Sequence, residues 1–134
     1  MPYLSSIWVA ANKIGHKESA DYGLFKYTNG TEETKVATGT SPWGVLVCRD
    51  RRTQYVVNQD DNTVSQVRDG SVVAEIATGG TSPYGICEGS IADKHGDYPV
   101  FVTNYASNTV TKIINGKVNE VFGVGQGPRG ICCD

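Results

Sequence analysis

One block of sequence occurs three times along the chain, and this repetition restricts the folds open to it more than any other feature. A Pro-x-Gly-apolar step occurs at 42–45, 83–86 and 128–131. A short apolar run ending in asparagine occurs at 9–12, 55–58 and 101–104, so that Asn12, Asn58 and Asn104 follow one another at intervals of 46 residues. Repeats of this length are typical of architectures in which each unit buries its faces against its neighbours.

Each repeat also contains a dipeptide that favours a tight hairpin turn: Asn-Gly at 29–30, Asp-Gly at 69–70 and Asn-Gly at 115–116. Such pairs suit type I′ turns, which need positive φ at both central residues. The flanking segments are β-branched or alternate between apolar and polar residues, as strands do. A Gly-x-x-Pro step then leads into the next unit, from Gly39, Gly80 and Gly125. No segment has a helical period, so we predict an all-β chain of four-stranded units.

The runs Tyr55-Val56-Val57-Asn58 and Phe101-Val102-Thr103-Asn104, each followed by Asn-Thr-Val, resemble the YVTN-type β-propeller repeat, a relative of the NHL repeat. The resemblance covers nearly the whole chain. It implies one domain, 1–134, with three four-stranded blade repeats at about 7–44, 45–85 and 86–130. Propellers of this type serve in surface layers, adhesion, scaffolding and occasionally catalysis, so the implied fold does not fix an activity.

Three blades are too few to surround a central channel, because propellers typically have four to eight. Segment 131–134 reads as the first strand of a blade, and 7–12 reads as the second strand of one. We therefore expect a homodimer in which each copy completes the other's divided blade, giving six blades. A trimer would give nine, outside the usual range. The alternative is that the sequence is part of a longer propeller chain, for example one of seven blades.

In such a propeller, the crossover into a blade and the loop after its second strand lie on one face. We expect a ligand-binding site there, because aromatic rings, a guanidinium and amides can stack on and hydrogen-bond a sugar or another polar ligand. The alternative is that the rings cap the core between blades and the amides cap turns. The candidate ligand-binding residues are Trp43, Tyr84, Arg129, Asn12, Asn58, Asn104 and Tyr105.

Two loops are longer than the repeat requires, at 13–22 on this face and at 88–99 on the opposite face. Extra loop length marks either function or tolerance of insertions. The chain's two histidines, His16 and His95, lie in these two loops and so on opposite faces. Asp60 and Asp61 are expected to be solvated turn acids, without the spacing of a calcium loop. We predict no catalytic residues, no metal ligands and no cofactor.

The four cysteines, Cys48, Cys87, Cys132 and Cys133, have neither zinc-ligand spacing nor that of a disulfide framework. Cys87 and Cys132 each come two residues after the glycine of a Pro-x-Gly step, where the first such step has the aliphatic Leu46. We therefore expect reduced thiols in the core, and the adjacent pair Cys132 and Cys133 is a weaker candidate for a redox site. Reduced cysteines, and a start without the pattern of a secretory signal, suggest a cytoplasmic protein but leave the localisation unknown.

The charge balance, 12 basic against 14 acidic residues, argues against nucleic acid as a partner. The apolar runs are too short to insert in a membrane. We therefore expect a non-enzymatic binding or interaction module for a glycan or protein partner. The alternatives are a metal-dependent lyase or lactonase, as the propeller resemblance implies, and a structural assembly unit without a small ligand.

Overall fold

The computed structural model describes residues 6–11 and 23–134, and in that part of the chain every regular element is a β-strand. The all-β prediction is therefore confirmed. No helix long and apolar enough to cross a membrane is present among these residues.

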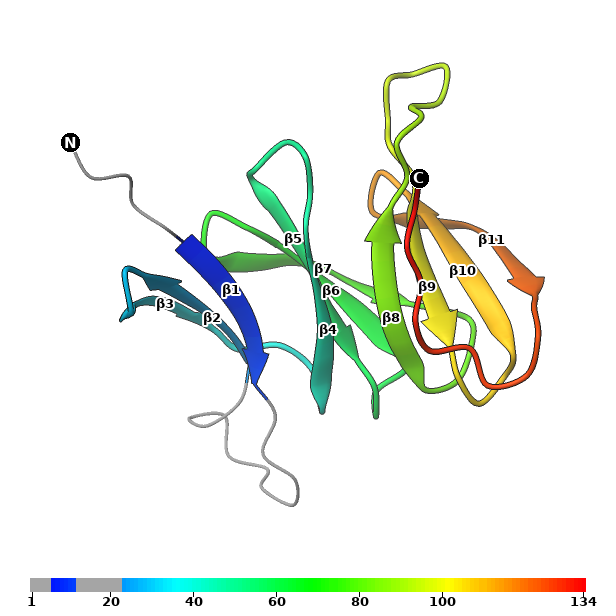
Figure 1. Cartoon of the computed structure of the whole chain (residues 1–134), viewed down its shortest axis with the longest axis horizontal. Helices are drawn as coiled ribbons and strands as arrows, with labels where there is room; N and C mark the ends of the chain where they lie inside the picture. Colours follow the sequence, from blue (N-terminus) through cyan, green and yellow to red (C-terminus); the bar gives the residue numbers. More distant parts are fainter. Residues whose placement is uncertain (1–5, 12–22) are drawn as a thin grey trace.

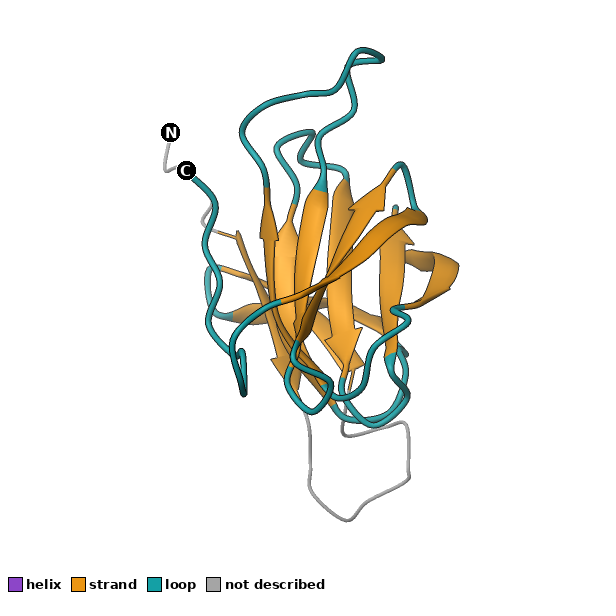
Figure 2. Ribbon diagram, turned by 90° about the vertical axis from the view of Figure 1, so that its right-hand side faces the viewer, coloured by secondary structure: helices purple, strands orange, loops and turns teal. Residues whose placement is uncertain are grey.

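The eleven described strands form three antiparallel sheets that stand side by side in a row, in the order in which they occur along the chain (Figure 1). Sheet 1 has three strands and sheets 2 and 3 have four each, and the row does not close on itself. Loops gather at the two opposite ends of the strands (Figure 2). Sheet 1 contains β1 (Ser6–Ala11), β2 (Gly23–Thr28) and β3 (Thr31–Val36); sheet 2 contains β4 (Pro42–Val47), β5 (Thr53–Asn58), β6 (Thr63–Arg68) and β7 (Ser71–Ala77); sheet 3 contains β8 (Pro83–Glu88), β9 (Val100–Asn104), β10 (Thr109–Ile114) and β11 (Lys117–Gly123).

The three predicted hairpin turns are confirmed by their backbone angles. Asn29, Asp69 and Asn115 have φ of 51°, 50° and 51°, and the glycine after each has φ between 76° and 81°. Positive φ at both central residues is the requirement of a type I′ turn, whose twist matches that of the strands it joins. Each turn fixes the register of the last two strands of its sheet.

Apolar side chains fill the spaces between neighbouring sheets. We call the side of a sheet toward the preceding sheet its rear face and the opposite side its forward face. Between sheets 2 and 3, Tyr55, Val57 and Val64 on one forward face pack against Val102 and Ile113 on the next rear face. Between sheets 1 and 2 the packing side chains are Leu24, Val36, Trp8, Ala10, Val56, Val67, Val45 and Val72. Burial between sheets, rather than within any one of them, therefore stabilises the fold.

Sheets 2 and 3 lie close together at their first strands, β4 and β8, where the Pro-x-Gly step supplies a glycine. A Cβ at Gly44 of β4 would lie 2.8 Å from the carbonyl oxygen of Tyr84 on β8. A Cβ at Gly85 would collide in the same way with the carbonyl oxygen of Arg129. The segment 128–134 therefore lies against β8 as β8 lies against β4, although it pairs with no described strand.

The structure corrects the predicted equivalence of the first asparagine. In sheet 2 Asn58 lies opposite Thr63, and Val57 opposite Val64. In sheet 1 the residue that corresponds to Val64 is Leu24 of β2, because Leu24 pairs with Val36 as Val64 pairs with Ile76. The partner of Leu24 on β1 is Ala10, so Ala11, not Asn12, stands at the position of Asn58.

A shift of one residue along a strand moves each side chain to the other face of its sheet. The observed register turns Trp8 and Ala10 toward the core with sheet 2. The predicted register would have turned Val9 there instead. Packing therefore decides against the alignment suggested by the asparagine spacing. Asn12 itself lies outside the described residues.

The expectation of four reduced core thiols is also wrong. Cys87 on β8 and Cys133 form a disulfide, which attaches segment 128–134 to sheet 3. Cys132 is free and exposed, so it is not a core residue, and only Cys48 is a buried free thiol as expected. Reduced cysteines therefore no longer support a cytoplasmic location.

Thiol titration tests this pairing. Unfolded without a reductant, the protein should show two reactive thiols, and four after reduction, with Cys87 and Cys133 joined in the unreduced peptide map. Because the bond closes a long loop, Cys133→Ser should lower the free energy of unfolding by up to about 4 kcal/mol. Cys132→Ser is the control: it should keep the Cys87–Cys133 bond and lower the number of thiols that react without reductant from two to one. Four thiols without reductant would contradict the pairing.

Candidate functional site

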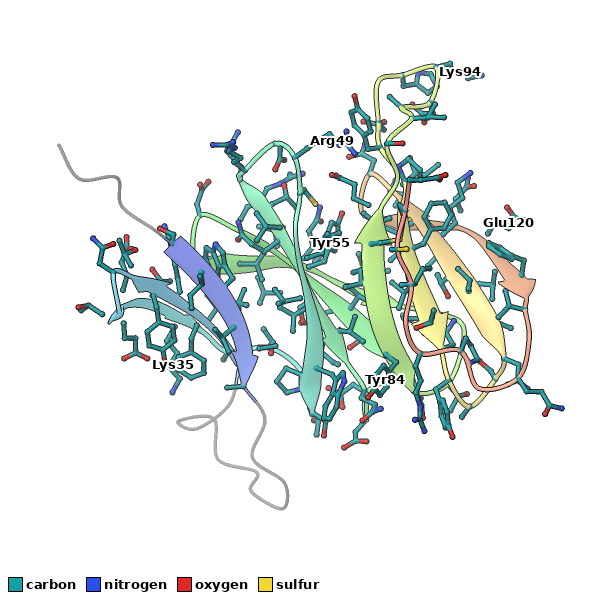
Figure 3. The ribbon with its side chains drawn as sticks, in the orientation of Figure 1. Lys35, Arg49, Tyr55, Tyr84, Lys94 and Glu120 are labelled. Atoms are coloured by element: carbon teal, nitrogen blue, oxygen red, sulfur yellow. A yellow bond between two sulfur atoms is a disulfide. The ribbon has the colours of Figure 1, made fainter. Side chains whose placement is uncertain are left out.

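Four of the predicted ligand-binding residues lie together at one end of the sheets. The ring centroids of Trp43 and Tyr84 are 5.4 Å apart. The Arg129 guanidinium carbon is 5.9 Å from the Tyr84 ring centroid and 4.6 Å from that of Tyr105. Tyr84 marks this end of the molecule at the bottom of Figure 3. We call Trp43, Tyr84, Tyr105 and Arg129 the aromatic rim.

The aromatic rim results from the repeated Pro-x-Gly step. Trp43 and Tyr84 each precede the glycine of a first strand, and Arg129 precedes Gly130 in the segment beside β8. Because the glycines let neighbouring first strands approach closely, the three side chains before them come into contact. Tyr105 joins them from the loop that follows β9.

The aromatic rim is open to solvent. Trp43 is 47% exposed and Tyr105 is 38% exposed, values unusual for large rings whose role is to fill a core. A guanidinium stacked on ring faces keeps its in-plane N–H groups directed outward, where they can donate to an anion or a hydroxyl. The rim can therefore stack on a flat ligand and hydrogen-bond its polar edge.

The predicted asparagines have a different role. Asn58 is fully buried, and its amide donates to Thr63 Oγ1 at 3.1 Å and to Ser65 Oγ at 2.8 Å. Its Oδ1 accepts from the Gly39 backbone amide at 3.1 Å. A Cβ at Gly39 would lie 2.7 Å from the Asn58 amide carbon, which explains why glycine starts the crossover there.

Asn104 repeats this arrangement in sheet 3. It is fully buried, and its Nδ2 donates to Thr109 Oγ1 at 3.1 Å and to Thr111 Oγ1 at 2.9 Å. Its Oδ1 is buried without a hydrogen-bond partner. Both asparagines fasten the second strand to the third, and Asn58 also holds the crossover, so a ligand at the surface does not reach them.

The neighbouring acids also serve the loops. Asp61 accepts a hydrogen bond from the Thr40 backbone amide at 2.6 Å, and the Ser41 hydroxyl donates to Asp60. These bonds tie the loop after β5 to the crossover before β4. The longer loop at 13–22 and its His16 lie outside the described residues.

The opposite end of the sheets carries a cavity that the sequence patterns did not indicate. A cavity of about 300 Å³ lies between the β4–β5 loop and the β8–β9 loop. Arg49 donates through Nε to Glu88 at 3.0 Å and lies 3.9 Å from the Tyr98 ring centroid. Arg49 stands at the opposite end from Tyr84 in Figure 3. Only the length of the 88–99 loop could have drawn attention to this cavity.

Two groups that line this cavity, the thiol of Cys48 and the phenol of Tyr55, are held in their neutral forms. Burial, followed by the charge of Glu88, raises the pKa of the Cys48 thiol to about 12. Burial, and to a smaller extent the electrostatic interaction with Cys48, raises the pKa of the Tyr55 phenol to about 12. Cys48 is therefore not an activated nucleophile, because a thiol reacts as its thiolate.

The 88–99 loop is stabilised by its own acid. Asp93 accepts from the backbone amides of Asp97 at 3.0 Å and His95 at 2.8 Å, and these bonds lower the pKa of Asp93. The loop lies on the opposite face to the rim, as predicted, with Lys94 at its tip in Figure 3. Across residues 6–11 and 23–134, no three histidine, cysteine or acidic side chains gather as a metal site would need.

Comparison with known proteins shows the fold alone. No family model matches the chain, and no curated protein matches it. A functionally unknown protein from Desulfotomaculum acetoxidans DSM 771 is similar in structure, with a TM-score of 0.61 and 16% identity over 80% of this chain and 37% of that one.

AztD from Citrobacter koseri is similar over 98% of this chain and 38% of its own, with a TM-score of 0.60 and 12% identity. The apo form of AztD gives the same TM-score over 39% of its length. The present chain therefore spans less than half the length of these structures.

Replacement of Asn58 tests its structural role. Asn58→Ala should lower the free energy of unfolding by about 2–3 kcal/mol in urea, because buried partners lose their hydrogen bonds. Asn119→Ala, at an exposed position of β11, is the control and should change stability by less than about 0.5 kcal/mol. Equal effects at the two sites would contradict the buried role.

Proposed function

We propose that the chain is a non-enzymatic binding module of the β-propeller type whose ligand is a glycan held at the aromatic rim. The observation that carries this proposal is the contact series from Trp43 through Tyr84 and Arg129 to Tyr105, on an open surface. Exposed rings offer flat apolar faces to the C–H side of a sugar, and Arg129 offers donors to its hydroxyls or carboxylates. A protein surface is the second ligand class that such a rim suits, because interface hot spots favour Trp, Tyr and Arg.

We propose further that the sheets are blades of the YVTN type and that two copies form one six-bladed propeller. Support comes from the two ends of the row of sheets, because both ends carry apolar side chains that are exposed to solvent. On sheet 1, Ile7 is 59% exposed and Val9 38% exposed. On sheet 3, Phe122 is 37% exposed, and with Phe101 and Val110 it lines an apolar groove of about 440 Å³.

These end residues correspond to core residues elsewhere in the chain. Phe101, Val110 and Phe122 occupy the positions that Tyr55, Val64 and Ile76 hold in the packed space between sheets 2 and 3. By the observed register, Ile7 and Val9 occupy the positions of the buried Val100 and Val102. The forward face of sheet 3 and the rear face of sheet 1 thus have the chemistry of two surfaces that pack together.

Mass in solution tests the closure. Light scattering coupled to gel filtration should give about 29 kDa, twice the 14.4 kDa of one chain, and the mass should stay constant on dilution through the micromolar range. A mass of one chain at all concentrations would remove the support for a homodimeric propeller. It would leave glycan binding at the rim to be judged separately.

Binding to an array of neutral and acidic glycans tests the ligand proposal. Tyr84→Ala and Trp43→Ala should each weaken binding of the best glycan by about 2 kcal/mol, roughly thirty-fold. Tyr98→Ala, which removes an arginine-stacked ring at the opposite end, is the matched control and should have no effect. Arg129→Gln should abolish any preference for acidic glycans. No binding to the array, or an equal loss with Tyr98→Ala, would contradict the proposal.

A further inference from the structure

As far as residues 6–11 and 23–134 show, sheet 1 lacks the strand that begins sheets 2 and 3. In those sheets the first strand pairs with the second, β4 with β5 and β8 with β9. In sheet 1, β1 holds the position of a second strand, and its edge away from β2 has no strand partner among the described residues. On β4, which contacts β1, Val47 is 44% exposed.

Segment 128–134 has the opposite deficiency: it is placed as a first strand, but no second strand lies beside it among the described residues. It is placed as a first strand, since the Thr103 hydroxyl donates to the Arg129 carbonyl at 2.8 Å, Cys133 is bonded to Cys87, and the Ser90 hydroxyl donates to the carbonyl of Asp134. Its sequence begins with the same Pro-x-Gly step as β4 and β8.

Within one chain these two deficiencies cannot satisfy each other. Segment 128–134 and β1 lie at opposite ends of the row of sheets, with sheet 2 between them (Figure 1). A second copy related by a two-fold axis would bring each segment 128–134 to the β1 of the other chain.

Resting on the proposed propeller closure, we infer that segment 128–134 of each copy adds to the free edge of β1 in the other, and that this pairing joins the aromatic rims of the two chains into one ring. The pairings of β4 with β5 and of β8 with β9 are identical, with Val45 opposite Val56 and Ile86 opposite Val102. Transferred through the observed register of β1, this pattern sets Ile131 opposite Val9 and Cys132 opposite Trp8.

The glycines support this arrangement. Gly44 approaches the carbonyl of Tyr84, and Gly85 approaches that of Arg129. At Gly130, in contrast, no atom of the described residues lies within 4 Å of where a Cβ would stand. Gly130 is thus the third member of a series in which the first two each accommodate the next first strand. In the dimer the next first strand is β4 of the second copy, whose Trp43 carbonyl would fill the space at Gly130.

The consequence for the site is that the aromatic rim of each chain forms half of a larger ring. Within one chain Trp43 contacts Tyr84, and Tyr84 contacts Arg129. Across the dimer Arg129 would stand beside Trp43 of the second copy, so the series continues around the channel mouth as a ring of Trp, Tyr and Arg repeated twice. A ligand on the two-fold axis would then contact cations and rings from both chains.

Cross-linking tests the inferred register. Antiparallel partners have Cα atoms about 4.5–5.5 Å apart, within disulfide range. Trp8→Cys should therefore form a disulfide with Cys132 of the second copy on mild oxidation, giving a dimer of about 29 kDa on non-reducing gels and a disulfide-linked peptide that joins position 8 to Cys132. The double variant Trp8→Cys/Cys132→Ser should give none. If Val9→Cys cross-links to Cys132 instead, the inferred register is overturned.

A second variant covers the case in which Trp8→Cys fails to fold. Gly130→Ala should raise the dimer dissociation constant at least ten-fold with no loss of monomer stability, because the added Cβ meets only the second copy. Gly123→Ala is the control and should leave the dimer unchanged, because its Cβ also has no neighbour within 4 Å in one chain and the corresponding residue of sheet 2 is already an alanine, Ala77. Equal affinities for the two variants would overturn the strand exchange.

The outcomes separate this inference from the proposals it rests on. A dimeric mass without either cross-link would reject the strand exchange while leaving another dimer in place. A monomeric mass would reject the closure together with the strand exchange. Absence of glycan binding by a cross-linked dimer would reject only the ligand proposal.

Discussion

The close approach of neighbouring first strands is the constraint on which the rest of this structure depends. At Gly44 the backbone of β4 lies against a carbonyl oxygen of β8, and at Gly85 the backbone of β8 lies against one of segment 128–134, with no room for a Cβ at either glycine. This spacing lets the β-branched side chains farther out on each sheet interlock with the next sheet. It also brings together the residues just before the glycines, so the same contact that sets the angle between sheets assembles Trp43, Tyr84 and Arg129.

The same constraint explains why the ends of the molecule carry exposed apolar residues. A sheet whose two faces are both built for burial cannot satisfy them alone, and a row of three such sheets leaves one rear face and one forward face open. Here these faces belong to sheets 1 and 3 and include Ile7, Val9 and Phe122. Exposed apolar surface of this kind, next to an unpaired strand edge, marks a place for association.

Turn chemistry and repeat spacing were enough to predict most of the fold. The Asn-Gly and Asp-Gly pairs located all three hairpins, and the Pro-x-Gly steps located β4, β8 and the segment beside β8. Sequence failed where packing decides between nearly equal alignments. At β1, the asparagine at position 12 suggested one register, and the burial of Trp8 and Ala10 selected the other.

Part of the candidate site could also be predicted from the repeat spacing. Positions before the glycines are equivalent by repeat, so the grouping of Trp43, Tyr84 and Arg129 could be predicted. Whether Asn58 and Asn104 face a ligand or the interior depends on their threonine and serine neighbours across the strand, which no motif shows. The Cys87–Cys133 bond joins residues that come together only when a first strand packs on its neighbour.

If a second copy joins the two aromatic rims into one ring, ligand binding and assembly are thermodynamically linked. A ligand that contacts both chains binds the dimer and not the single chain, so it stabilises the dimer by mass action. The two-fold axis also places two aromatic rims, one from each chain, around the same channel mouth, and each rim is one half-site. Weak contacts from individual rings can then add when a ligand reaches both half-sites. An extended, repeating glycan can exploit such an arrangement better than a single sugar, because a single sugar gains only one half-site. The residue before the third glycine then has a reason to be arginine. Trp43 and Tyr84 already supply stacking surfaces, and a cation between the rings of two chains adds the polar contact that stacking alone lacks.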